Sequence, residues 1–345
     1  MRSSVCVTLS VLLCWALFGC GRRSDNVLVI YSPHGKDQLS AFEKSFESAH
    51  PGVDVQWLDL GSQEILDRLR SEKANPQADL WWGAPSTLFS RAARENLLEP
   101  YRPSWHDQVG AESRGSGDFW YGTYLTPEVI VYNSTLLKRH EVPSDWDQFV
   151  DPRWKNRIIL RDPLASGTMQ IIFASILLRS LQEHRSLEPG YAWLRKLDAN
   201  NKEYVLNPTL LYQKLARGEA ALTLWNLTDS EIQRTRYNYP FQYVVPSSGT
   251  PLVAEGIALV RGSRRATVAR QVYEWCTEEP NLVLAAEQFY RIPSRRDVSP
   301  EKLPGWIRIA LDQIQPWDLD NEAIERNSES WMQYWDTHIR GQGND

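Results

Sequence analysis

Three consecutive residues, Ser166, Gly167 and Thr168, have the types and the position needed to bind an anion. They come at the start of an apolar stretch that runs to about Leu181 and predicts a long helix. The first turn of a helix presents backbone N–H groups without partners in the helix, and its positive end favours negative charge. A phosphate, phosphonate or carboxylate suits this position, whereas plain helix capping by Ser166 or Thr168 is the alternative.

A second set of polar residues could surround a small polar ligand with hydrogen-bonding groups. Ser32 and His34 directly follow the run from Val27 to Tyr31, which predicts a buried strand. Ser86 follows a later strand, and Thr126 lies in a long extended segment, so both would face the first pair from neighbouring loops. Hydroxyl groups discriminate between ligands by geometry rather than by charge. Each residue could equally stabilise a local turn.

Strand-like and helix-like runs alternate near the start of the chain. The strands are predicted at 27–31, 53–57 and 78–82, and the helices between them carry apolar residues at helical spacing. This alternation indicates an α/β fold with a mainly parallel sheet covered by helices on both faces. In such sheets ligands bind beyond the carboxyl ends of the strands, where the loops 32–35 and 83–86 lie.

Two long extended segments, residues 122–133 and 251–260, separate regions with different patterns. The region between them contains its own strand-like runs and the long apolar helix, so a second lobe is predicted there. The expected division is residues 27–124 and 258–345 for the first lobe and residues 125–257 for the second.

The amino terminus has the pattern of an export signal. Arg2 precedes an apolar stretch that ends at Leu17-Phe18-Gly19-Cys20 and is shorter than the ~20 residues that span a bilayer. A cysteine after Leu-x-Gly resembles the lipobox of bacterial lipoproteins, which implies cleavage after residue 19, lipidation of Cys20 and a short linker over residues 20–26. Two acyl chains would anchor the protein stably to a membrane. An ordinary signal peptide is the alternative.

Composition narrows the possible functions. The net charge is −5 and basic runs are absent, which argues against binding to nucleic acid. Beyond the signal and the candidate anchor Cys20, Cys276 is the one remaining cysteine, and its apolar neighbours predict a packed core position. The sequence contains no nucleotide-binding loop of the Walker type, no zinc-binding helix motif and no nucleophile elbow. We therefore expect a protein that is not an enzyme, without cofactor or bound metal.

Short motifs along nearly the whole mature chain resemble the type II periplasmic solute-binding proteins, in the branch for ferric iron, aminoethylphosphonate, polyamines and sugar phosphates. The resemblance implies two α/β lobes joined by two crossover strands, which close on a ligand by hinge motion. It also implies delivery to an ABC permease driven by a separate ATPase subunit. A lipid-anchored periplasmic or extracytoplasmic monomer is expected. The motifs are Tyr31-Ser32-Pro33-His34, Ala78-Asp79-Leu80-Trp81-Trp82-Gly83, Leu125-Thr126-Pro127, Asp162-Pro163-x-x-Ser166-Gly167-Thr168, Arg217-Gly218-Glu219-Ala220-Ala221-Leu222 and Glu255-Gly256-Ile257-Ala258-Leu259-Val260.

The resemblance also directs attention to polar residues in the second half of the chain. Asn226 and Asp229 follow a predicted strand and could bind hydroxyl or amine groups. Glu255 stands where the sugar-phosphate branch places a hydroxyl-binding acid, although it could pair structurally with an arginine at 264–265 or 295–296. Ferric-binding relatives carry adjacent tyrosines near Asp229, and this sequence has none there, so the hard oxygen ligands for iron are missing.

The favoured ligand is therefore a sugar phosphate or a phosphonate. An aminophosphonate also fits, because its ammonium group would meet the acids. Ferric iron or a polyamine bound by the same fold remains an alternative. A receptor that feeds a signalling kinase would have the same fold and cleft. An exported carbohydrate or phosphate-ester hydrolase is the alternative from another class, since two positioned acids suffice for glycoside hydrolysis.

Overall fold

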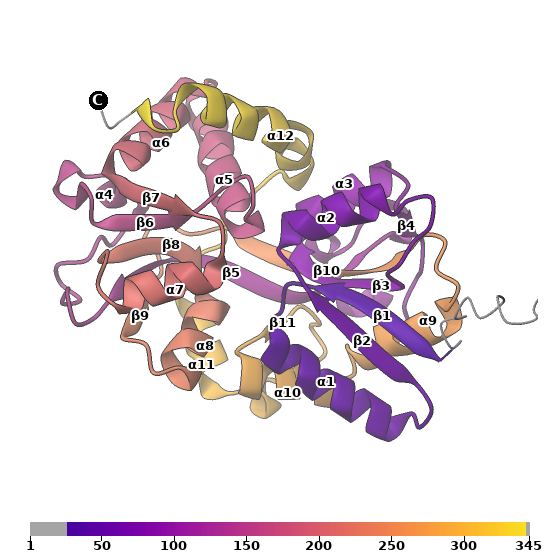
Figure 1. Ribbon diagram of the computed structural model, residues 1–345. Helices are drawn as coiled ribbons and strands as arrows, with labels where there is room; N and C mark the ends of the chain where they lie inside the picture. Colours follow the sequence, from indigo (N-terminus) through magenta and orange to yellow (C-terminus); the bar gives the residue numbers. More distant parts are fainter. Residues whose placement is uncertain (1–25, 343–345) are drawn as a thin grey trace, which may run out of the picture.

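The computed structural model describes residues 26–342, which form two α/β lobes (Figure 1). The predicted signal peptide and Cys20 lie outside these residues. No helix within residues 26–342 combines the length and the apolar character needed to cross a membrane. The predicted α/β class with two helix-flanked lobes is confirmed, but the sheets are mixed rather than mainly parallel, because the crossover strands pair antiparallel with their neighbours.

The first lobe contains a sheet with the strand order β2-β1-β3-β10-β5. Strand β1 pairs in parallel with both β2 and β3, as the βαβ pattern predicts. Short 3-10 helices occur in the loop before β5. The elements are β1 (Val27–Ser32), α1 (Lys36–Ala49), β2 (Asp54–Asp59), α2 (Ser62–Ser71), β3 (Leu80–Pro85), α3 (Ser86–Arg94), β4 (Leu98–Glu99), the 3-10 helices His106–Gln108, Ala111–Ser113 and Ser116–Asp118, α9 (Ala266–Trp275), α10 (Glu279–Phe289), β11 (Ile292–Pro293) and the 3-10 helix Pro300–Lys302.

Strand β1 is buried on both faces. Leu28 and Ile30 belong to one apolar cluster, together with residues of α1 and α9, whereas Val29 and Tyr31 belong to another with residues of α2 and α3. Because helices cover both faces of the sheet, the strand is a continuous apolar run rather than an alternating one.

The second lobe has the strand order β5-β8-β6-β7, and β6 pairs in parallel with both of its neighbours. Its core is one large apolar cluster around the long helix α5, which is buried along most of its length. The elements are α4 (Trp146–Phe149), the 3-10 helix Pro152–Trp154, β6 (Ile158–Arg161), α5 (Gly167–His184), α6 (Glu188–Asn200), β7 (Asn201–Val205), α7 (Pro208–Ala216), β8 (Leu222–Asn226), α8 (Leu227–Arg236) and β9 (Phe241–Val244).

Two crossover strands join the lobes, β5 (Tyr121–Asn133) and β10 (Leu252–Val260). The first half of β5 pairs with β10 in the first lobe, and its second half pairs with β8 and β9 in the second lobe. These are the two extended segments that the sequence predicts. Residues near the middle of both strands therefore lie at the floor between the lobes.

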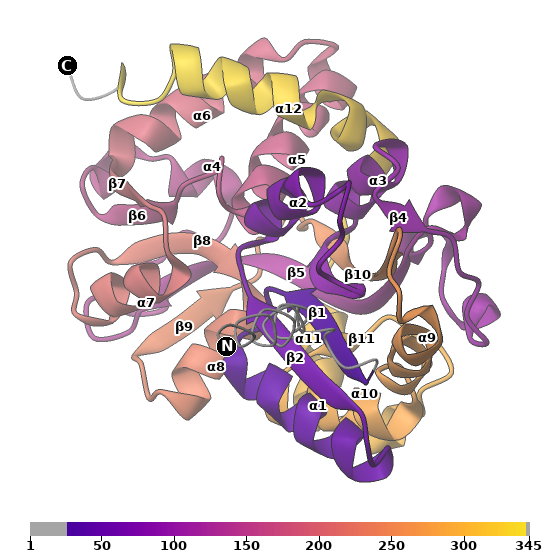
Figure 2. The ribbon, with the colours of Figure 1, turned by 45° about the vertical axis from the view of Figure 1, so that its right-hand side comes forward.

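The C-terminal helices differ from the expected division of the chain. Helix α11 (Gly305–Gln313) connects the lobes, and α12 (Asn321–His338) packs on α5, with Trp331 and Trp335 in the second-lobe cluster (Figure 2). The sequence assigned this segment to the first lobe. The packing corrects that assignment for α12, because its apolar face belongs to the second-lobe cluster, while polar contacts such as Arg91 to Ser328 connect it to α3.

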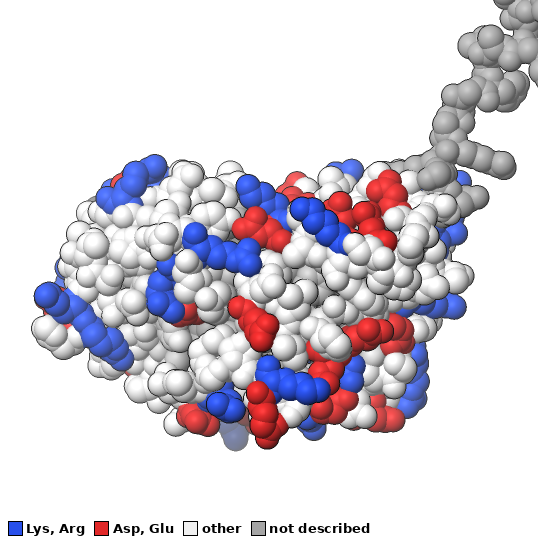
Figure 3. All heavy atoms as spheres, turned by 90° about the horizontal axis from the view of Figure 1, so that it is seen from below, with Lys and Arg blue, Asp and Glu red and all other residues white. Residues whose placement is uncertain are grey.

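Cys276 is fully buried in the first-lobe cluster that contains Trp275, as predicted. Burial raises the pKa of its thiol well above the usual value. The face shown in Figure 3 carries interspersed acidic and basic side chains, and neither sign forms one continuous patch.

Candidate functional site

A cleft of about 920 Å³ lies between the two lobes. Its walls are loops that follow β1, β2 and β3 in the first lobe and β6, β7 and β8 in the second, with both crossover strands at the floor. These are the carboxyl ends of the parallel strands, where ligands bind in α/β sheets. Eight residues proposed from the sequence line this cleft: His34, Thr126, Ser166, Gly167, Thr168, Asn226, Asp229 and Glu255.

The two other proposed residues, Ser32 and Ser86, are buried and are not among the residues that line the cleft. The hydroxyl oxygen of Ser32 accepts a hydrogen bond from the backbone N–H of His34 at 3.3 Å. Ser86 is the first residue of α3. Ser32 therefore shapes the loop that carries His34 rather than facing the cleft.

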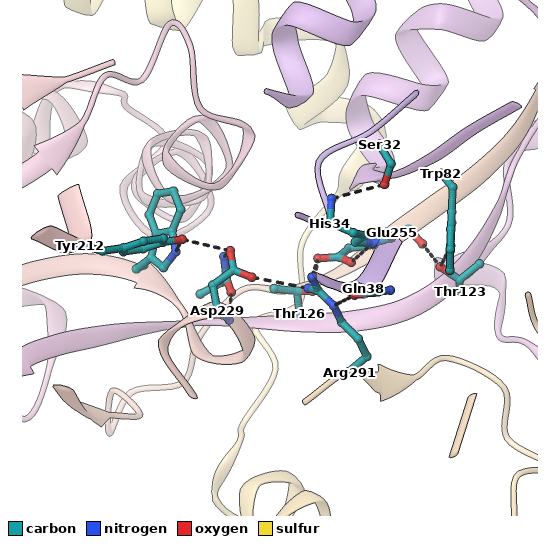
Figure 4. A network of polar contacts seen from close by, with 12 residues as sticks. Ser32, His34, Gln38, Trp82, Thr123, Thr126, Tyr212, Asp229, Glu255 and Arg291 are labelled. Carbon is teal, nitrogen blue, oxygen red and sulfur yellow. Dashed lines mark hydrogen bonds and ion pairs between the residues drawn. The ribbon is translucent and has the colours of Figure 1, made fainter. Parts of the chain in front are cut away.

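Glu255, on crossover strand β10, is the centre of a polar network at the floor of the cleft (Figure 4). Its Oε2 lies 3.0 Å from Nε2 of His34, and its Oε1 accepts a hydrogen bond of 2.6 Å from the hydroxyl of Thr126. Nη1 of Arg291 is 3.6 Å from Oε1. Arg291 is thus the arginine partner of Glu255, and none of the four arginines considered from the sequence takes that place.

The charges of this network follow from its burial and its contacts. Burial alone would raise the pKa of Glu255, but the charge of Arg291 and the hydrogen bond with His34 outweigh it and lower the pKa to about 2. Burial is the main cause of the lowered pKa of His34. At pH 7 Glu255 is therefore a carboxylate, and His34 is neutral, with the proton on Nε2 because its partner can only accept.

The ring of His34 is held by close packing. It makes edge contacts with Trp82 and Tyr124, at centroid distances of 4.9 and 5.6 Å. A Cβ atom at Gly83 would lie 2.7 Å from Nε2 of His34, and this glycine has φ of +91°. Only glycine satisfies both the conformation and the close approach. Residues of strand β3 thus fix the imidazole next to Glu255.

Asp229 extends the network into the second lobe. Its Oδ1 is 3.7 Å from Nη1 of Arg291, and its Oδ2 accepts a hydrogen bond of 3.0 Å from the side-chain amide of Asn226. The hydroxyl of Tyr212 lies 3.5 Å from the same oxygen. A continuous series of polar contacts thus runs from Tyr212 through Asp229 and Arg291 to Glu255, and it links the lobes (Figure 4).

Tyr212 is the tyrosine whose hydroxyl lies beside Asp229, and it remains a neutral phenol at pH 7. Burial is the main cause of its pKa being raised well above 10, and its oxygen accepts a hydrogen bond from the indole of Trp225 at 3.0 Å. A raised pKa disfavours the phenolate that a ferric ion would need as a ligand. Within residues 26–342, no group of three or more His, Cys, Asp or Glu side chains is arranged to hold a metal ion.

The start of helix α5 combines capping with free backbone donors. The hydroxyl of Ser166 accepts a hydrogen bond of 3.4 Å from the N–H of Met169, which is a helix cap. Gly167 and Thr168 follow it and line the cleft, and N–H groups in this first turn have no acceptor within the helix. A Cβ atom at Gly167 would lie 2.9 Å from the ring of Pro85, so glycine permits the first lobe to approach here.

Arg161 lies beside this helix start. It ends strand β6, lines the cleft and is 4% exposed. Nη2 makes a weak contact with the carbonyl of Ala165 at 3.4 Å, while Nε and Nη1 have no hydrogen-bond partner among the described residues. Burial lowers the pKa of this guanidinium. A buried guanidinium with unused donors, next to a helix amino terminus, has the chemistry that suits an anion.

Glu128, on crossover strand β5, is a buried acid of the cleft, whereas Arg161 is a buried base. Its side chain lines the cleft, the residue is 1% exposed, and Oε2 has no hydrogen-bond partner among residues 26–342. Burial, followed by the nearby charges of Glu255 and Asp229, raises its pKa well above the usual value. Among the residues that the structure describes, no cation forms an ion pair with this buried acid.

Sequence reasoning missed Arg161, Glu128, Arg291 and Tyr212. Arg161 has a detectable signal, because a single arginine ends an apolar strand just before the Ser-Gly-Thr segment. Glu128 likewise interrupts the apolar crossover segment. Arg291 and Tyr212 have no such signal, since they reach the cleft only through packing.

Comparison with known proteins agrees with this geometry. The family model described as "Bacterial extracellular solute-binding protein" matches residues 75–318. The "Probable ABC transporter periplasmic-binding protein y4fP" of Sinorhizobium fredii is 24% identical over 91% of this chain and 87% of its own length. A protein of Salmonella typhimurium named "Putative 2-aminoethylphosphonate-binding periplasmic protein" is 25% identical over 93% of this chain and 95% of its own length.

Solved structures show the same fold. The periplasmic binding protein AfuA from Actinobacillus pleuropneumoniae, solved with fructose-6-phosphate, superposes with a TM-score of 0.79 at 23% identity, covering 91% of this chain and 98% of AfuA. The family match spans well over half of the chain, and the lobes, crossover strands and cleft agree with it. This chain belongs to the bacterial extracellular solute-binding protein family.

Proposed function

We propose that this protein is the extracytoplasmic solute-binding component of an ABC importer, and that its ligand is a small solute carrying a phosphoryl or phosphonyl group. Arg161 carries the proposal, because its buried guanidinium faces the cleft with two unpartnered nitrogens beside the amino terminus of α5. Charge-assisted hydrogen bonds from arginine and from a helix start suit a tetrahedral oxyanion. The ligands named for the Salmonella and Actinobacillus proteins support this class.

In the proposed transport cycle, both lobes contact the solute and then close around it. The anion would bind to Arg161 and the first turn of α5 in the second lobe, while the rest of the solute meets His34, Thr126 and the acids at the floor. Rotation about the middle of β5 and β10 would then enclose the solute. The closed form would be the one presented to the permease, and the separate ATPase would supply the energy for transport.

Calorimetric titration against matched ligand pairs tests this function. The pairs are fructose 6-phosphate with fructose, and ethylphosphonate with propionamide. We expect saturable binding of at least one phosphorus-bearing member, with a Kd in the micromolar range or below, and a loss of about 100-fold or more for its neutral counterpart. Equal binding of both members of each pair, or binding of neither phosphorus compound nor any other phosphate ester or phosphonate tested, would contradict the proposal.

Lipid anchoring through Cys20 is part of the same proposal. Replacing Cys20 with serine in the full-length chain removes the thiol that would carry the acyl chains, so the protein is expected to move from the membrane fraction to the soluble fraction. Cell fractionation with immunoblotting measures this. The control is Cys14→Ser, within the signal segment, which should leave the distribution unchanged. Equal membrane retention of the Cys20→Ser and unmodified proteins would show that the anchor lies elsewhere.

A further inference from the structure

Two buried ionisable side chains in the cleft, a base and an acid, have no ion-pair partner within residues 26–342. Arg161 is the cation, in the second lobe, and Glu128 is the acid, on the crossover strand at the floor. Both line the same cleft. An uncompensated buried charge is unfavourable by several kcal/mol or is neutralised, so a ligand that supplies the missing charge gains affinity at each position.

The other acids of the cleft are already partnered. Glu255 has His34, Thr126 and Arg291, and Asp229 is contacted by Asn226 and Arg291. Arg291 is a cation shared by these two acids. In the described part of the chain, Glu128 has no counterpart of this kind.

The position of Glu128 suits a ligand group rather than a structural bond. It is the residue on β5 where pairing changes from the first lobe to the second, with Thr126 opposite Val253 on β10 and Glu128 itself opposite Asn226 on β8. Its backbone is fixed, because its N–H donates to the carbonyl of Pro251 at 3.1 Å. The carboxyl group of Glu128 is therefore held at the floor of the cleft, where β5 passes from one lobe to the other.

We propose that Glu128 binds an ammonium group of the ligand, so that the solute is an aminoalkyl phosphonate or a similar amine-bearing phosphate ester rather than a sugar phosphate. The inference rests on the proposed function, because Arg161 and the start of α5 hold the anionic end. Asp229 and Glu255 lie near enough to raise the pKa of Glu128, and they add to the attraction for a cation. A neutral hydroxyl group at the same place would supply no positive charge to balance these acids.

Titration of the unmodified protein with two ligands of equal size tests this, using 2-aminoethylphosphonate and 2-hydroxyethylphosphonate. We expect the amine to bind at least 30-fold more tightly, which corresponds to about 2 kcal/mol for one buried charge pair. Glu128→Gln keeps the shape of the side chain, and it should reduce this ratio to less than about 3 without weakening the hydroxy compound. Asp67→Asn, a more exposed acid that also lines the cleft, is the matched control and should keep the full ratio.

The outcomes separate the two proposals. If both phosphonates bind the unmodified protein equally well, Glu128 does not bind an ammonium group, while the proposed function stands. If neither phosphonate nor any phosphate ester binds, both proposals fail. The comparison of the two ligands needs no variant, so equal binding of both would overturn the assignment even if Glu128→Gln does not fold. Retention of the 30-fold preference in a folded Glu128→Gln protein would also overturn the assignment.

Discussion

Replacing Arg161 with methionine is expected to weaken the binding of phosphate esters and phosphonates by about 30-fold or more, because truncating one partner of a buried charge pair typically costs 2–5 kcal/mol. Methionine has similar length but neither charge nor donors. Calorimetric titration with the best ligand of the unmodified protein measures the effect.

The same substitution should leave the fold intact. Nε and Nη1 of Arg161 have no partner among the described residues, so an apolar side chain removes a buried charge without breaking an ion pair. We expect the midpoint of thermal unfolding to stay the same or to rise. Arg157→Met is the control, since Arg157 lies just before the same strand and is exposed. An Arg161→Met protein with affinity within about 3-fold of the unmodified protein would contradict the assigned anion site.

Replacing Arg291 with methionine is expected to lower the free energy of unfolding by about 3–5 kcal/mol at pH 7, the usual effect of removing one partner from a buried ion pair. Arg291 lies within 4 Å of both Glu255 and Asp229, and its Nε also donates to Gln38 at 2.9 Å. Without it, two acids face each other in a buried site. Urea unfolding followed by circular dichroism measures the loss.

The size of this loss should depend on pH in a defined direction. A carboxyl whose pKa falls to about 2 on folding contributes stability that is complete above its unfolded pKa, about 4.5, and is lost as pH falls towards 2. The difference in the free energy of unfolding between the unmodified and Arg291→Met proteins should therefore be largest near pH 7 and should decrease below pH 4.5. Arg296→Met, which removes an exposed pair with Glu112, should change stability by less than about 1 kcal/mol. A small, pH-independent effect of Arg291→Met would contradict the role of Arg291.

The sequence predicted those parts of the fold that depend on local pattern. The run at 27–31 became β1, and the extended segments became the crossover strands, because burial on both faces leaves continuous apolar runs. The place of α12 could not be predicted. Its apolar residues Trp331 and Trp335 show that one face must be buried, but not which lobe covers it.

The candidate site was predictable where residues directly follow strands. His34, Ser166 and Asp229 all follow strands that the sequence indicates, and all line the cleft. Arg291 stands just before the two-residue strand β11, so only the packing of the C-terminal segment brings it to Glu255. Glu128 lies within an apolar strand, where an isolated acid has no spacing that identifies its role.

A crystal structure of the protein with a bound phosphate ester or phosphonate would test the central claim most directly. The account predicts oxygens of the phosphorus group within hydrogen-bond distance of the Arg161 guanidinium and of backbone N–H groups at Gly167 and Thr168. A ligand whose phosphorus group lies elsewhere in the cleft, with Nε and Nη1 of Arg161 still unpartnered, would contradict it.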